Sequence, residues 1–151
     1  MTLWKRNLVG AAVAAAAVSV STTFILHPYW QDYQRTVRPA HTAMADEPID
    51  VDGQTWRVRN VSRSTERPGY GARLPEGTVL MNVVVERSGP PEAGFGCVGY
   101  LVEGERSWRV DGPPCGKATS MPWTAMIPAS AEPTAIDIRD SSGSLLIRLQ
   151  L

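Results

Sequence analysis

The sequence predicts an all-β fold, a β-sandwich of about seven strands, preceded by one N-terminal transmembrane helix. Apolar and polar residues alternate with a period of two along residues 48–151, and no stretch there follows the helical period of about 3.6. Turn-forming Gly, Pro, Asp and Ser separate the alternating runs. Residues 8–26 carry no charge. As a helix they match the hydrocarbon thickness of a bilayer.

The N-terminal part is expected to anchor the chain in the cell membrane as a single span. Lys5 and Arg6 precede the apolar run and favour a cytoplasmic N-terminus. Trp4 lies before the run, and Tyr29 and Trp30 follow it, as aromatic residues do at membrane interfaces. The chain then divides into a cytoplasmic n-region, a transmembrane signal-anchor, a juxtamembrane stalk and an extracytoplasmic β-sandwich domain, at residues 1–7, 8–26, 27–47 and 48–151.

A cleaved signal peptide is the alternative to an anchor. The basic start and the Ala-rich run fit that pattern. Small residues suited to cleavage occur at 17–21, but a cut there would leave the apolar residues 24–26 in the mature chain. The small residues at 43–45 lie too far from the apolar run. We favour the uncleaved anchor, and either interpretation exports the domain.

The stalk contains a short segment with helical features. Pro28 suits the first turn of a helix that would run to Val37. Such a helix would place Trp30 and Tyr33 on one face, along the membrane surface. A stalk with no fixed structure fits the sequence equally well.

The domain is expected to consist of strands from end to end. Asp52-Gly53 between two alternating runs is a two-residue hairpin signal. The runs that predict strands are residues 48–51, 54–61, 77–88, 97–102, 106–111, 120–128, 134–140 and 144–151. A small closed barrel is the alternative to a sandwich.

The core should be lined by one face of each strand. The most apolar run places Val79, Met81, Val83 and Val85 on that face. Large aromatic residues on strands pack more often than they bind ligands. We therefore expect three tryptophans to anchor the core: Trp56, Trp108 and Trp123.

Four stretches carry a resemblance to a known family: "IDVDGQTWRVRNV", "LPEGTVLMNVVVERSG", "LVEGERSWRV" and "WTAMIPASAEPTAIDIR". Their layout resembles the membrane-anchored, extracytoplasmic immunoglobulin-like domains of unknown function in actinobacteria and other Gram-positive bacteria. The resemblance implies an immunoglobulin-like sandwich with an accessory or binding role and no catalytic residues. The chain departs from the commoner pattern in its cysteine pair and in lacking a clear Pro-Gly before the exit strand.

Two cysteines, Cys97 and Cys115, are candidates for a disulfide. They lie at the ends of two strands expected to pair as a hairpin, which brings strand ends within bridging distance. A bridge across this interval would stabilise the domain by about 3 kcal/mol in the chain-entropy model. Export favours the disulfide. Two reduced thiols remain the alternative.

Five arginines cluster in the sequence and suggest a surface for an anionic partner. The residues are Arg57, Arg59, Arg63, Arg67 and Arg73. The first two should share the outward face of one strand, and the others should lie on the adjoining loop. Guanidinium groups there would bind lipid headgroups, acidic glycans or carboxylates of a partner. A solvated strand face is the alternative, and the favoured one.

Composition and motifs argue against several function classes. The formal net charge is zero, with 15 basic and 15 acidic residues, so nucleic acid is not an expected partner. The domain has no His after His41 to serve as a general base, and no hydrolase, metalloprotease or phosphate-loop motif. We expect no enzyme activity, no cofactor and no metal site. The acidic residues at 46–52 are expected to be solvated rather than to bind Ca²⁺.

The expected function is that of a single-pass bacterial envelope protein that presents an interaction or accessory module. The expected partners are the membrane and an envelope protein. The alternative is a membrane-tethered binding protein for a small ligand, a lipid headgroup or an anionic glycan. An enzyme would have to rely on carboxylates alone for acid–base chemistry and is the least favoured class.

Overall fold

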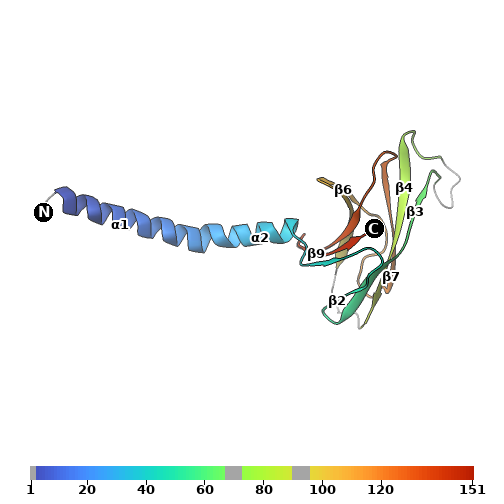
Figure 1. The fold of residues 1–151 in the computed structure, drawn as a ribbon, viewed down its shortest axis with the longest axis horizontal. Coiled ribbons are helices and arrows are strands. Elements are labelled where there is room, and N and C mark those ends of the chain that lie inside the picture. Colours follow the sequence, from blue (N-terminus) through green and yellow to red (C-terminus); the bar gives the residue numbers. More distant parts are fainter. Residues whose placement is uncertain (1–2, 67–72, 90–95) are drawn as a thin grey trace. The chain divides into compact units, whose positions relative to one another are not determined.

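The computed structural model describes residues 3–66, 73–89 and 96–151, in two compact units that meet between Val37 and Arg38 (Figure 1). The first unit is helical. It consists of α1 (Leu3–Ser21), a wider π-helical turn η1 (Thr22–Leu26) and α2 (His27–Val37). The second unit contains all the strands.

The helical unit is one continuous helix, with an apolar first part and aromatic residues toward its C-terminal end. Its 35 residues from Leu3 to Val37 are long and apolar enough to cross a membrane, although a signal sequence near an N-terminus has the same features. The hydroxyl groups of Ser19 and Thr22 donate to backbone carbonyls one turn earlier, at 2.9 and 2.8 Å. These two hydroxyl groups are therefore satisfied within the helix.

Pro28 accounts for the wide turn. It has no N–H to donate to the carbonyl four residues earlier, so the α-helical ladder cannot continue unchanged through it. The N–H of His27 instead reaches the carbonyl of Thr22, five residues back. Of the two alternatives that the sequence left open for this segment, the helix is present, from His27 to Val37, and it continues the apolar helix directly. Trp30 and Tyr33 lie on one face with ring centroids 5.7 Å apart.

Nine strands in the described residues form two sheets, so the fold is a sandwich and not a closed barrel (Figure 1). The five-stranded sheet has the order β1 (His41–Ala43), β9 (Leu145–Gln150), β8 (Ala135–Asp140), β5 (Cys97–Glu103), β6 (Arg106–Arg109). The four-stranded sheet has the order β2 (Ile49–Val51), β3 (Gln54–Ser64), β4 (Thr78–Ser88), β7 (Ser120–Pro128).

The turn between β2 and β3 confirms the hairpin prediction. Val51 pairs with Gln54, which leaves Asp52 and Gly53 as the two loop residues. Both have positive φ, at 51° and 75°. This is the left-handed pair that a type I′ hairpin turn requires.

Inward-facing side chains of both sheets form a single core. Alternation along β4 buries Met81, Val83 and Val85 as predicted, and Val79 packs against them at the margin. Trp56 and Trp123 are 1% and 2% exposed. The opposite sheet contributes mainly aliphatic side chains: Leu101, Ile136, Ile138, Ile147 and Leu149.

Trp108 corrects the prediction of three core anchors. It lies on β6, a four-residue strand at the edge of its sheet, and is only partly buried. The guanidinium of Arg106 covers its ring at 5.5 Å from the centroid. An edge position gives an aromatic side chain a neighbouring strand on one side only, so a large ring there remains partly open.

The strand β1 falls within the segment predicted as a stalk, and it raises the strand count above the expected seven or so. His41–Ala43 pairs in parallel with Ile147–Leu149, and the N–H of Ala40 donates to the carbonyl of Leu145. The sandwich thus includes residues before 48. A strand of three residues shows no alternation long enough to be recognised in sequence.

Candidate functional site

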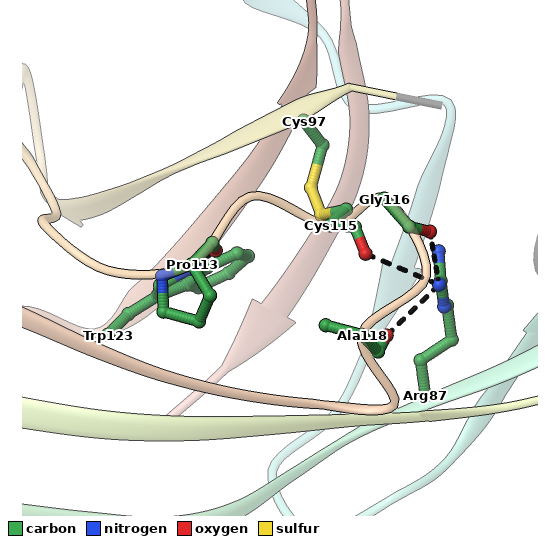
Figure 2. The surroundings of a disulfide bond; sticks show 7 residues. All are labelled: Arg87, Cys97, Pro113, Cys115, Gly116, Ala118 and Trp123. Atoms are coloured by element: carbon green, nitrogen blue, oxygen red, sulfur yellow. Dashed lines mark hydrogen bonds between the residues drawn. A yellow bond between two sulfur atoms is a disulfide. The ribbon is translucent and has the colours of Figure 1, made fainter. Parts of the chain in front are cut away.

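The cysteine pair lies at one end of the sandwich, where β5 begins and the β6–β7 loop returns. Cys97 and Cys115 lie at disulfide distance, with Cα atoms 5.2 Å apart (Figure 2). Both side chains are buried, at 4% and 0% exposure. The contact joins the five-stranded sheet to the loop that leads into the four-stranded one. A bond here therefore constrains the path between the sheets.

Trp123 holds the earlier part of this loop. Its indole N–H donates to the carbonyl of Pro113 at 2.9 Å (Figure 2). The ring fits because two neighbours are glycines. A Cβ on Gly99 would lie 2.8 Å from the ring, and a Cβ on Gly112 would lie 2.7 Å from it. Loop and core are thus packed around one tryptophan.

Arg87 holds the later part of the loop and is buried at 3% exposure. Its Nη2 donates to the carbonyls of Gly116 and Ala118 at 2.7 and 3.0 Å, with the carbonyl of Cys115 at 3.4 Å (Figure 2). The guanidinium carbon lies 5.3 Å from the centroid of the Trp56 ring. Burial lowers the pKa of Arg87.

The surroundings of Arg87 are neutral. Within the described parts of the chain no carboxylate forms an ion pair with it, and its Nη1 is buried without a hydrogen-bond partner. The positive charge of Arg87 is therefore stabilised by the dipoles of backbone carbonyls and by the face of the Trp56 ring. This residue was not singled out from the sequence, although the signal was present. The inward alternation of Met81, Val83 and Val85 continues to position 87.

The five arginines of the sequence cluster do not form one surface. Arg57 and Arg59 both donate to the carboxylate of Glu86 on the neighbouring strand β4. The hydrogen bond from Arg59 lowers the pKa of Glu86 most, and the hydrogen bond from Arg57 lowers it further. One carboxylate between two guanidiniums cancels part of their charge. These two residues share the outward face, as predicted.

Arg63 departs from the predicted loop position because β3 continues to Ser64, and a β-bulge sets the face on which it lies. The register with β4 shifts between Val58 and Asn60, so residues beyond the bulge change face relative to simple alternation. Arg63 lies within β3, opposite the inward residue Met81, rather than on a loop. Its guanidinium donates to the carbonyl of Ala131, in the loop after β7.

Of the two remaining cluster residues the structure describes Arg73, which precedes β4. Arg73 is exposed, and its backbone forms an isolated antiparallel β-bridge with that of Glu66. Arg67 lies outside the described residues. The structure therefore brings together Arg57 and Arg59 and places Arg63 elsewhere.

An open hollow of about 540 Å³ lies beside Glu86 and Arg87. Arg57 also lines it, and the other lining residues are Pro48 and hydroxylated side chains such as Thr55, Ser88 and Thr119. The carboxylate it contains is held ionised by its arginines, which does not suit a general acid. Among residues 3–66, 73–89 and 96–151, no three His, Cys, Asp or Glu side chains gather as metal ligands do.

No family model and no curated protein matches the chain. A solved structure with partial similarity is that of an uncharacterised β-sandwich protein from Clostridium difficile 630. It is 7% identical, the match covers 76% of this chain and 95% of the other, and the TM-score is 0.40.

Of the family resemblance drawn from the sequence, the two-sheet β architecture is present in the structure. The immunoglobulin-like type stays a prediction. So does the assignment to a bacterial group.

Proposed function

We propose that this chain is a single-pass envelope protein whose N-terminal helix anchors it in the cell membrane and whose sandwich is an extracytoplasmic interaction or accessory module. The observation that carries the proposal is the buried cysteine pair at disulfide distance in a domain that follows an apolar helix. Disulfides persist in oxidising compartments and are rare in the cytosol. The basic residues before the apolar run favour the same orientation.

An immunoglobulin-like topology is part of the proposal. Two features support it: the first strand, β1, pairs in parallel with the last strand, β9, and each sheet combines strands from both halves of the domain. Greek-key sandwiches have such mixed strand orders. The cysteine pair differs from the inter-sheet bridge of antibody domains, since it joins β5 to a loop.

The proposed role is binding rather than catalysis. The support is the chemistry of the hollow at Glu86, whose carboxylate is already paired with two arginines. The alternative, a tethered receptor for a small ligand, lipid headgroup or anionic glycan, has less support. Inward side chains such as Val83, Leu101 and Ile136, each at 0% exposure, fill the space between the sheets.

Thiol labelling on intact cells of the native host tests the proposal. Free thiols are alkylated with a membrane-impermeant reagent, the protein is digested without reduction, and peptides are identified by mass spectrometry. The proposal predicts a linked Cys97–Cys115 peptide together with a retained N-terminal peptide. A linked pair without the N-terminal peptide would replace the anchor with a cleaved signal. Two free thiols, in a domain that an externally added protease cuts only after the cells are permeabilised, would place the domain in the cytosol and overturn the proposal.

A further inference from the structure

The outward face of the five-stranded sheet carries a row of polar side chains in register. Arg109 on β6 lies opposite Tyr100 on β5, and Tyr100 lies opposite Asp137 on β8. Asp137 in turn lies opposite Arg148 on β9, which pairs with Thr42 on β1. Neighbouring positions along these strands point into the core. The row therefore crosses the whole sheet on its outer side.

Asp137 is the buried centre of this row, at 1% exposure. Arg148 binds it through two parallel hydrogen bonds, Nε to Oδ1 at 2.6 Å and Nη2 to Oδ2 at 2.8 Å. This bond to Asp137 raises the pKa of Arg148. The carboxylate is covered by the side chains around it.

Arg139 extends the row along β8. Its guanidinium carbon lies 5.3 Å from the centroid of the Tyr100 ring, and its Nη2 lies 4.0 Å from Asp137. Its Nε is buried without a hydrogen-bond partner in the described residues. Arg109, on the other side of the tyrosine, is exposed, and no described carboxylate forms an ion pair with it. Arg139 thus stacks on the tyrosine ring, Arg109 lies at the paired position of the next strand, and both guanidiniums have donors without a partner in the described residues.

The charge on this face is less balanced than on the opposite sheet. Its outward strand positions carry Arg109, Arg139 and Arg148 against a single carboxylate, Asp137, which is buried. On the other sheet Glu86 is shared by two arginines at the surface. Arg139 and Arg148 are also held in place by stacking and by bidentate pairing. Binding therefore costs them little rotamer entropy.

We propose that the outward face of the five-stranded sheet, centred on Arg109, Tyr100 and Arg139, binds an acidic segment of a partner protein. Planar guanidinium groups match carboxylates bidentately, and that of Arg139 is also held against the Tyr100 ring. A membrane surface is less suited, because anionic lipids attract each basic residue by only about 1 kcal/mol and favour flexible clusters of several. The inference rests on the proposed role as an interaction module and names the surface and the chemistry of its partner.

Peptide binding to the full chain tests the surface. The protein is placed in phosphatidylcholine nanodiscs and titrated against fluorescein-labelled deca-glutamate, with deca-glutamine as the uncharged control. Fluorescence anisotropy is read at about 0.02 M and about 0.15 M salt, since screening weakens contacts between exposed charges. Two double variants are compared, R109Q/R139Q and R57Q/R59Q. Each removes two positive charges, one pair from each sheet, and thermal unfolding checks that both remain folded.

The proposal predicts that wild type binds deca-glutamate and not deca-glutamine, more weakly at higher salt. R109Q/R139Q should bind at least about tenfold more weakly, while R57Q/R59Q stays within about twofold of wild type. Equal losses in both variants, a loss confined to R57Q/R59Q, or no binding by wild type would overturn it. Binding to phosphatidylglycerol vesicles without binding to the peptide would assign the face to lipid instead. Thiol labelling reports the compartment independently, so either result leaves the anchoring proposal separately testable.

Discussion

Opening the bond between Cys97 and Cys115 should destabilise the sandwich by about 3 kcal/mol. The bond closes a sequence interval of 18 residues. In the chain-entropy model the denatured state of a chain with a loop of this size loses about 11 cal/mol/K, or about 3 kcal/mol at room temperature. Both cysteines are buried, so alanine in their place adds a smaller packing loss.

The measurement is urea unfolding of the full chain, followed by tryptophan fluorescence, with and without reductant. Trp56 and Trp123 lie in the core and report loss of packing. The double variant Cys97→Ala/Cys115→Ala is the control, because reductant should not change its stability. A change below about 1 kcal/mol on reduction of wild type would refute the reasoning. So would a reductant effect of equal size in the double variant.

Three further outcomes are expected. Gly99→Ala should destabilise by about 1–3 kcal/mol, since its Cβ would lie 2.8 Å from the indole ring, whereas Gly96→Ala, with nothing within 4 Å, should be near neutral in the same urea titration. The NMR-measured pKa of Glu86 should lie below its usual value of 4.5 and rise in Arg59→Gln. Because the pKa of Glu86 is depressed in the folded state, the pairing of Glu86 with its arginines stabilises the fold above the unfolded pKa of this group. That stabilisation is lost as the pH falls through the folded pKa. An unchanged pKa of Glu86 in Arg59→Gln would contradict the pairing. Arg148→Met should cost about 3 kcal/mol, because the buried carboxylate of Asp137 loses its bidentate partner and keeps only Arg139 at 4.0 Å, and a loss below about 1 kcal/mol on urea unfolding would contradict that reasoning.

Local sequence patterns predicted most of the elements. The alternation around Val83 and Val85 predicts a buried face because successive side chains on a strand point to opposite sides. Asp52-Gly53 predicts a hairpin because few other pairs adopt positive φ twice in succession. The strand at His41–Ala43 could not be found this way. Its order comes from pairing with β9, more than a hundred residues later in the chain.

The polar surfaces were less predictable. Arg57 and Arg59 were expected on one face, which alternation alone implies, but their neutralisation by Glu86 depends on strand register. The bulge between Val58 and Asn60 has no local signature here, and it decides where Arg63 lies. Arg87 was within reach of the pattern, since it continues the inward face. Because arginine is usually exposed, the pattern alone did not mark Arg87 as a buried residue.

The sequence by itself determined the elements that depend on neighbours along the chain: an apolar helix long enough to span a bilayer, strands with one buried face, and a tight turn. These follow from side-chain solubility and backbone geometry, which act over a few residues. Tertiary structure alone decided which charges meet. Tyr100, Asp137 and Arg148 come from three strands, and they form one row because the register of β5, β8 and β9 aligns them. Register is set by the packing of the whole core, and no local segment encodes it.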